Sequence, residues 1–235
     1  MDEIRAKSKS ELFAALKKID MSVPRRSQGR KTEHIERWSI CHFLSTFGEL
    51  DFFDFPLLLR HRDRPDFRLE YSHQIIGIEV TEATKKEYAE YQALLDREFP
   101  NSFGEPSLFK DDAPKLKIRD YRKLLAENKL HADGWEGDSV EQEWAKYTFA
   151  SIIKKTDKLR SPGFIKYPKN WLLIYDNLPI YGLNREVGRN YLFNKLKPYW
   201  KYESIFTKIC IDRDTEMFCF EPNEKTLLKV NNVWL

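Results

Sequence analysis

Cysteine is scarce in this chain, and its spacing excludes a disulfide framework. The three cysteines, Cys41, Cys210 and Cys219, are an odd number, show no C-x-x-C spacing, and stand within apolar helical or strand patterns. Small core residues of a reduced protein usually have this placement. We therefore predict a protein of the reducing cytoplasm that has no structural disulfide.

Long apolar runs are also missing. No stretch approaches the roughly 20 apolar residues that a membrane-spanning helix needs. The first ten residues, MDEIRAKSKS, lack the apolar segment of a secretion signal. The sequence predicts a soluble cytoplasmic protein that does not bind a membrane.

Several common catalytic patterns are absent. The five histidines show neither H-x-x-x-H nor H-x-H spacing, and with the scattered cysteines they form no zinc pattern. The chain contains no G-x-x-x-x-G-K-[ST] loop and no G-x-S-x-G elbow. These absences disfavour zinc sites, nucleotide-driven motors and serine hydrolases.

The net charge is small. Forty Lys and Arg residues against 37 Asp and Glu residues give +3, so total charge does not by itself indicate a nucleic-acid-binding protein. Two segments are nevertheless locally basic: Arg25, Arg26, Arg30 and Lys31 form one patch, and Lys154, Lys155, Lys158 and Arg160 form the other. Either patch alone also fits a solvated loop or helix face.

The chain has enough apolar residues, 41% of 235, for one principal core. Helical spacing and short apolar runs predict the elements. Helices are expected near 10–19, 32–48, 83–97, 140–160 and 185–199, strands near 67–71, 75–80, 171–175, 205–211 and 217–220, and loops at 21–30 and 101–114. This order predicts an α/β fold with a mixed central β-sheet flanked by helices.

We expect two parts in the chain. Residues 1–30 are predicted to form an N-terminal helix and a basic linker. Residues 31–235 are predicted to form the principal domain, with a core of about 32–176 and a C-terminal helix and strands in 177–235.

The segment 64–81, RPDFRLEYSHQIIGIEVT, reads as a β-hairpin. If its turn is centred between residues 72 and 73, the facing pairs include Phe67 with Ile78 and Leu69 with Ile76. Both pairs are apolar and share one face. Ser-His is not one of the favoured Gly- or Asn-containing turns, so a register shifted by one residue is the alternative.

The same register puts Asp66 opposite Glu79 on the other face, with Cβ atoms about 5 Å apart. Two facing like charges repel, and a cation between them would reverse that cost. Mg²⁺ is commonly held by one or two carboxylates together with phosphate oxygens and water. The hairpin therefore predicts a metal site, with Thr81 on the same face beside it.

RPDF followed by an apolar strand ending in IGIEVT resembles the PD-(D/E)XK nuclease superfamily. The resemblance implies a restriction-endonuclease-like sandwich in which Asp66 and Glu79 coordinate Mg²⁺ or Mn²⁺. It also implies an assisting lysine two residues after the glutamate, where this chain has Thr81.

A variant of that superfamily supplies the lysine from the following long helix, ahead of a strand similar to LLIYD. The segment from Ile152 to Leu159, then Tyr167 and the strand WLLIYD at 171–176, resembles that arrangement. The likeness covers about residues 32–176. It implies a catalytic lysine at Lys155 or Lys158.

Position along the helix favours Lys155, because it lies three residues after Ile152 and flanks the apolar face. Lys158 is the second choice. A solvated helix flank explains either lysine equally well. Glu36 is a further metal ligand suggested by the resemblance, although a glutamate at a helix start is also favoured by the helix dipole.

These observations predict a metal-dependent nuclease that hydrolyses phosphodiester bonds, with DNA as the expected partner and Mg²⁺ or Mn²⁺ as the cofactor. The alternative is a catalytically inactive module of the same fold that binds nucleic acid or a protein. Residues 177–235 carry no chemical motif. They are expected to complete the sheet or to bind a partner, either a second copy of the chain or another protein.

Overall fold

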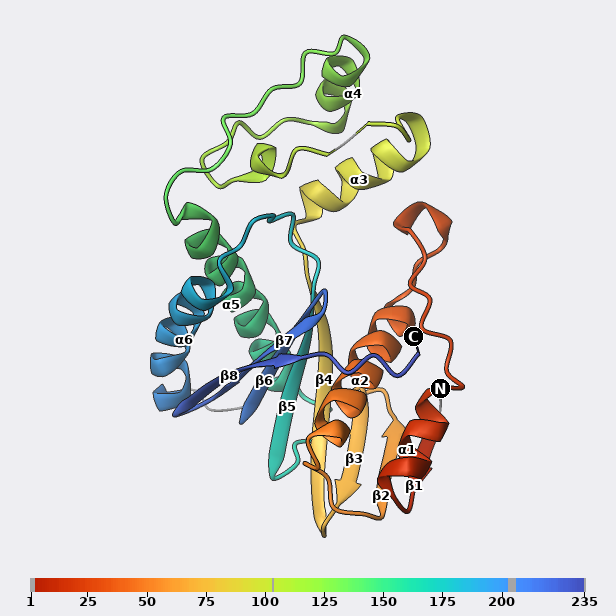
Figure 1. Cartoon of the computed structure of the whole chain (residues 1–235). Helices are drawn as coiled ribbons and strands as arrows, with labels where there is room; N and C mark the ends of the chain where they lie inside the picture. The colour runs from red at the N-terminus through yellow and green to blue at the C-terminus, as the bar shows by residue number, and fades with distance from the viewer. Residues whose placement is uncertain (1–2, 103, 203–205, 235) are drawn as a thin grey trace.

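The computed structural model describes residues 3–102, 104–202 and 206–234. Its centre is one eight-stranded sheet whose strands lie in chain order (Figure 1). They are β1 (Glu3–Ala6), β2 (Leu57–His61), β3 (Phe67–Tyr71), β4 (Gln74–Ala83), β5 (Lys169–Asp176), β6 (Lys208–Arg213), β7 (Glu216–Glu221) and β8 (Glu224–Lys229). Neighbours pair antiparallel except β4 with β5 and β5 with β6, which are parallel. The predicted α/β class with a mixed sheet is confirmed.

Helices cover both faces of this sheet (Figure 1). They are α1 (Lys9–Leu16), α2 (Thr32–Glu49), α3 (Lys86–Glu98), α4 (Ile118–Ala126), α5 (Ser139–Leu159) and α6 (Arg185–Tyr202), with short 3₁₀ turns η1 (Arg26–Gln28) and η2 (Pro106–Phe109). The pair α1 and α2 packs on one face, and α5 and α6 pack on the other. Among these described helices, none combines the length and the apolar character needed to cross a membrane.

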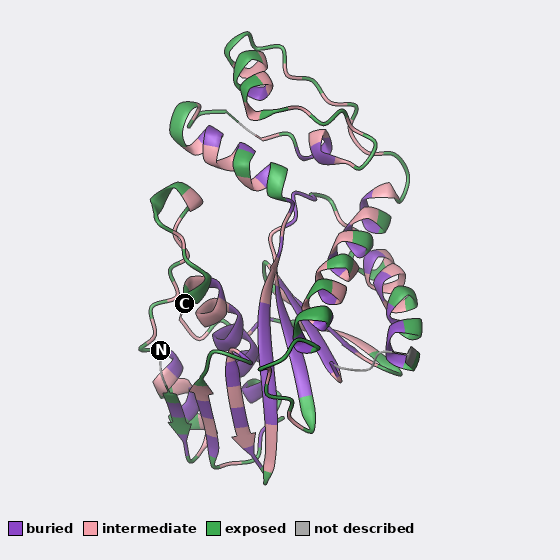
Figure 2. Ribbon diagram, turned by 180° about the vertical axis from the view of Figure 1, so that it is seen from behind, coloured by how far each residue is buried: buried purple, intermediate pink, exposed green. Residues whose placement is uncertain are grey.

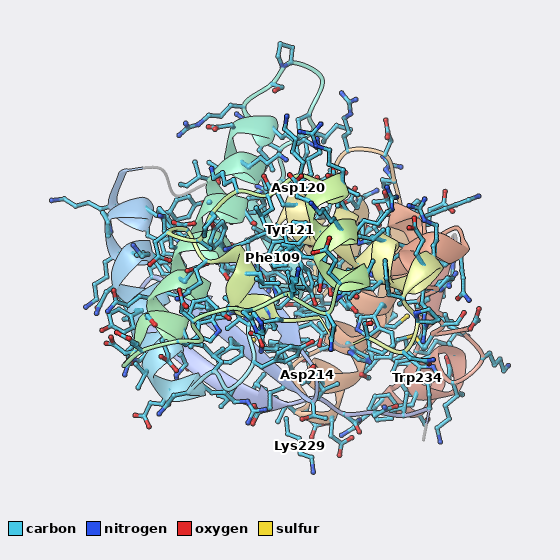
Figure 3. All side chains as sticks on the ribbon, turned by 90° about the horizontal axis from the view of Figure 1, so that it is seen from above. Phe109, Asp120, Tyr121, Asp214, Lys229 and Trp234 are labelled. Carbon is cyan, nitrogen blue, oxygen red and sulfur yellow. The ribbon has the colours of Figure 1, made fainter. Side chains whose placement is uncertain are left out.

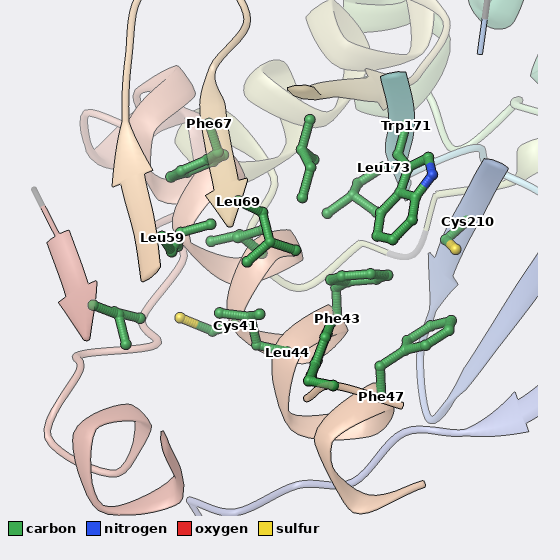
Figure 4. Close-up of a cluster of buried hydrophobic side chains, with 14 of the residues drawn as sticks. Cys41, Phe43, Leu44, Phe47, Leu59, Phe67, Leu69, Trp171, Leu173 and Cys210 are labelled. Carbon is green, nitrogen blue, oxygen red and sulfur yellow. The ribbon is translucent and has the colours of Figure 1, made fainter. Parts of the chain in front are cut away.

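Successive side chains of β4 point to opposite faces of the sheet, so the sequence of β4 determines which residues face α2 and which face α5. Ile76, Ile78 and Val80 are buried against α2, so the residues between them point towards α5. Figure 4 shows Phe43 and other α2 side chains packed onto the sheet on the α2 side, and the strands are mostly buried in Figure 2. Burying one such side chain fully contributes about 1.5–3 kcal/mol.

The three cysteines are buried core residues, as predicted. Cys41 lies on α2, while Cys210 and Cys219 face each other on β6 and β7. All three are free thiols.

A helical insert, residues 84–138, separates β4 from α5 and lies beyond the carboxyl end of β4 (Figures 1 and 2). It has a small core of its own, in which α3 packs on Phe109 and Tyr121. Their rings stack with centroids 5.5 Å apart, and they lie together over the middle of the molecule in Figure 3. Lys85 joins the insert to α5, because its ammonium pairs with Glu143 and lies 3.6 Å from the ring centroid of Tyr147.

Four elements differ from the prediction: β1, β2, β8 and α4 were not expected. Residues 1–30 contribute more than a helix and a linker, since β1 pairs with β2 at the edge of the sheet. β1 has only four residues, too few for a period to be recognised. The start of the expected strand 205–211, at Ile205, lies outside the described residues, and β6 itself begins at Lys208.

Helix α2 begins at Thr32, where the prediction put it, with Lys31 as its N-cap. It ends one residue later than predicted, because it continues past Gly48 to Glu49. Gly48 serves packing here, because a Cβ at this position would lie 3.1–3.2 Å from Phe13 and Leu12 of α1.

Candidate active site

The hairpin has the predicted register. Phe67 pairs with Ile78 and Leu69 with Ile76. The two turn residues, Ser72 and His73, have φ values of 46° and 59°. A two-residue type I′ turn requires φ above zero at both positions, and its twist matches that of the strands. This hairpin is therefore built without the glycine or asparagine that usually occupies such a turn.

Asp66 and Glu79 come together where β3 begins. Asp66 directly precedes Phe67, and its Oδ2 atom accepts a hydrogen bond from the backbone N–H of Val80 at 2.6 Å. Glu79, the residue before Val80, is only 6% exposed and points to the α5 side of the sheet. The charge of Glu79 acts on Asp66, so the two carboxyl groups lie near each other, and their metal-binding role stays a prediction.

The electrostatics of this pair are unusual. Burial, and next to it the charge of Glu79, raises the pKa of Asp66 from 3.8 to about 7. The Lys155 ammonium and the Val80 N–H act in the opposite direction but do not cancel the rise. When both carboxyl groups are ionised, the pair therefore carries more negative charge than the Lys155 ammonium offsets.

Lys155 reaches this pair from α5, where Nζ donates to Glu79 Oε1 at 2.5 Å. The other oxygen, Oε2, is buried and has no hydrogen-bond partner among the described residues. Lys158 is exposed and lines the hollow next to Lys155, and no bond joins it to either carboxylate within the described residues. Of the two predicted lysines, the structure brings Lys155 to the carboxylates.

Glu36 is not brought into this group. Its Oε2 atom lies 3.1 Å from Nε2 of His61, and its charge is the weakest of the influences that shift the pKa of Asp66. Within residues 3–102, 104–202 and 206–234, no three His, Cys, Asp or Glu side chains are grouped as a metal site would group them. The described site thus offers two carboxylates, Asp66 and Glu79.

A hollow of about 330 Å³ opens beside Thr81 and is lined by both basic patches. The N-terminal segment contributes Arg26, Arg30 and Lys31, and α5 contributes Lys155 and Lys158. Arg26 and Arg30 both bond Glu82 Oε1, at 2.7 and 3.0 Å. Two patches that are distant in the sequence therefore form one cationic rim.

Gly77 is a site residue that the sequence pattern did not indicate. It lies two residues before Glu79 on the same face of β4, and a Cβ there would come within 2.7 Å of the Tyr167 ring and 2.9 Å of Asn170 Oδ1. The close approach of Tyr167 to the strand therefore requires glycine. A lone glycine inside a strand pattern is the signal that could have found it.

Comparisons with models of known protein families, with curated proteins and with solved structures gave no match to this chain.

Proposed function

We propose that the chain is a metal-dependent nuclease that hydrolyses phosphodiester bonds, with DNA as the predicted substrate. One observation carries the proposal: Asp66 and Glu79 lie together with a single ammonium group between helix and sheet. Glu79 Oε2 is buried and has no hydrogen bond to any residue that the structure describes, and the pKa of Asp66 is raised to about 7. A structural ion pair of this burial normally has its lone pairs satisfied.

The donor set fits a divalent cation. Carboxylate oxygens are the ligands that Mg²⁺ prefers, and one or two of them are commonly completed by water and phosphate oxygens. Asp66 and Glu79 would hold the ion. When bound, the ion would lower the pKa of a water molecule and stabilise charge on the phosphoryl oxygens.

The chain's own cations supply the remaining functions. Lys155 uses one of its three N–H donors on Glu79 Oε1, which orients the carboxylate and leaves donors for a water or a phosphate oxygen. Lys31 and Lys158 line the same hollow and would bind phosphates next to the reacting one. The resemblance to the PD-(D/E)XK superfamily supports the same roles, with Lys155 in place of the lysine that Thr81 replaces.

The test uses metal binding and cleavage together. Calorimetry with Mg²⁺ and Mn²⁺, followed by incubation with plasmid and single-stranded DNA, should show binding and metal-dependent cleavage in the parent. Asp66→Asn and Glu79→Gln should each lower the cleavage rate by more than about a hundredfold, because each removes a charged ligand of an ion whose contribution is worth several kcal/mol.

Glu70→Gln is the matched control. Glu70 lies on β3 on the same face as Asp66, but its carboxylate pairs with Arg68 and Arg60 instead. This variant should cleave at the parental rate. Full activity in Asp66→Asn or Glu79→Gln would rule out the proposed site.

A catalytically inactive nucleic-acid-binding module is the second candidate, because two observations favour it. The ammonium group of Lys155 already neutralises Glu79, and Glu36 is bonded by His61 instead of completing a third ligand. In that case the incubations with DNA would show no cleavage, whether or not calorimetry detects metal binding. The protein would still bind nucleic acid.

A further inference from the structure

Two more hollows continue the one at the candidate site and form a groove between α3 and the basic segment 25–31, named here the α3 groove. Their volumes are about 550 and 460 Å³. The first shares Thr81 and Lys155 with the hollow at the site, the second shares Ala89 with the first, and Arg26 lines all three. The groove runs from Lys155, whose ammonium bonds Glu79, along α3 to the loop after β5, where Asn177 and Tyr181 line it. Figure 1 shows the segment around η1 beside α3.

The cations along this groove are available to an anionic ligand. Lys154 is exposed and has no carboxylate partner among the described residues. Within the described part of the chain, the ion pairs of Arg25 and Lys86 are loose and lie at the surface, at 3.6 Å with Asp96 and 3.7 Å with Glu90. Exposed pairs of this kind are worth about 0–1 kcal/mol, so phosphates can replace them.

The far end of the groove carries an exposed aromatic ring. Tyr181 is 66% exposed, more than any other large apolar side chain that is exposed in the described part of the chain. Tyr88 of α3 lines the same hollow as Tyr181. An exposed aromatic ring in a cationic groove is a platform on which a base can stack.

We infer that the α3 groove binds a single-stranded polynucleotide, with phosphates on Arg25, Lys86 and Lys154 and an unpaired base on Tyr181. The bases of a duplex are stacked on one another and present no free face to Tyr181. Each hollow has the size, roughly 300–1,000 Å³, that holds one small-molecule-sized group. The inference rests on the proposed function, since it names the substrate that the groove would bring to Lys155, beside Glu79.

Fluorescence anisotropy in EDTA tests binding apart from cleavage. Labelled single-stranded DNA and RNA of about 16 nucleotides, and a duplex of the same length, are titrated with the full chain. Single strands should bind more tightly than the duplex. Tyr181→Ala should weaken single-strand binding by about 5- to 150-fold, which corresponds to about 1–3 kcal/mol for one stacked base, and should leave duplex binding unchanged. The DNA and RNA arms identify which strand is preferred.

Controls separate stacking from charge and from folding. Tyr181→Phe keeps the ring and should bind like the parent, and Ile165→Ala removes an exposed apolar side chain outside the groove and should also bind like the parent. Lys154→Gln should lower the salt dependence of single-strand binding by about 0.7 in log–log slope.

Three outcomes would overturn the inference: a duplex that binds as tightly as the single strand, equal affinities for Tyr181→Ala and Ile165→Ala, or displacement of the oligonucleotide by polyglutamate of matched charge. The last would indicate an acidic peptide as the ligand. Single-strand binding that depends on Tyr181 but is never followed by metal-dependent cleavage would support the inference and reject the nuclease proposal.

Discussion

Two carboxylate sites on neighbouring central strands are built in opposite ways. The side chain of Asp176, at the end of β5, is fully buried and both of its oxygens are satisfied: Oδ2 accepts from Trp144 Nε1 at 2.6 Å and from Arg213 at 2.7 Å, and Oδ1 accepts from the N–H of Leu178 at 3.0 Å. Asp66 and Glu79 share one ammonium group and one backbone N–H, and a buried oxygen of Glu79 has no donor among the described residues. The Asp176 carboxylate is saturated with donors, whereas the Asp66–Glu79 pair is short of positive charge, as a site for an added cation must be.

The largest expected effect is on the cleavage rate, and it distinguishes Lys155 from Lys158. Both lie near Asp66 and Glu79, a pair named here the deficient site because it is short of positive charge. Lys155→Met should lower metal-dependent cleavage by about 10²–10⁴-fold, the range for losing a group that assists proton transfer or charge stabilisation. Lys158→Met should lose much less, since Lys158 contacts neither carboxylate in the described structure. Rates are measured at saturating Mg²⁺ with circular dichroism as the check on folding. Equal and undiminished rates would show that neither lysine assists catalysis.

At the Asp176 carboxylate, named here the saturated site, a substitution should change the free energy of unfolding instead of the cleavage rate. Arg213→Met leaves the buried Asp176 carboxylate without its cation, and breaking one partner of a buried pair costs about 3–5 kcal/mol. Urea unfolding at neutral pH measures this, and Mg²⁺ should not restore the loss. An unchanged free energy of unfolding would mean that Asp176 does not depend on Arg213. Restoration by Mg²⁺ would mean that Asp176 is itself a metal ligand.

The local part of the candidate site was predictable from the sequence. Period-two alternation along 67–80 sufficed to place Asp66 opposite Glu79, because side chains of a strand alternate between faces. Helical spacing likewise pointed to Lys155 rather than Lys158, since it needs only the position of Ile152 on the buried face. Both predictions used contacts within one element or between adjacent elements.

The rest of the candidate site depends on contacts between segments that are distant in the sequence. No periodic pattern in a single sequence indicates such contacts. The meeting of segment 25–31 with α5 around one hollow, and the approach of Tyr167 to Gly77, are of this kind. The side-chain donors to Asp176 come from α5 and β6, so the sequence could not distinguish a carboxylate that is saturated with donors from one that is not. Glu36 was placed on the correct helix, but its partner His61 on β2 was not foreseen because β2 was not.

At the deficient site, removing charge should stabilise the protein. The folded-state pKa of Asp66 is about 7, against 3.8 for the free group, so protonated Asp66 favours folding fully below about pH 4 and this contribution is lost as the pH rises through 7. A pKa that differs by one between the folded and unfolded states corresponds to about 1.4 kcal/mol of stability. In EDTA near pH 8, Asp66→Asn should therefore be more stable than the parent by about 2–4 kcal/mol, and near pH 4 the difference should vanish.

Urea unfolding across this pH range checks the prediction, with Glu70→Gln as the control. Because Glu70 pairs with two arginines, its replacement should be neutral or slightly destabilising and should show no gain above pH 7. If metal-free Asp66→Asn unfolds more easily than the parent, Asp66 is a structural residue that stabilises the hairpin through its hydrogen bond to the Val80 N–H.

The smallest expected effect is the pH dependence of stabilisation by Mg²⁺. Asp66 must lose its proton before it binds a cation. Each decrease of one pH unit below about pH 7 should therefore weaken Mg²⁺ binding by up to tenfold, about 1.4 kcal/mol. At a Mg²⁺ concentration near one hundred times the dissociation constant at pH 8, the parent should gain about 2.7 kcal/mol, and at pH 6 it should gain about 1.4 kcal/mol less. Thermal melting with and without Mg²⁺ measures both.

Asp66→Asn should gain nothing at either pH, whereas Asp176→Asn, although less stable throughout, should keep the parental gain and its pH dependence because its carboxylate is already saturated. If Asp176→Asn loses the gain and Asp66→Asn keeps it, the metal binds at the saturated carboxylate and the contrast between the two sites is reversed.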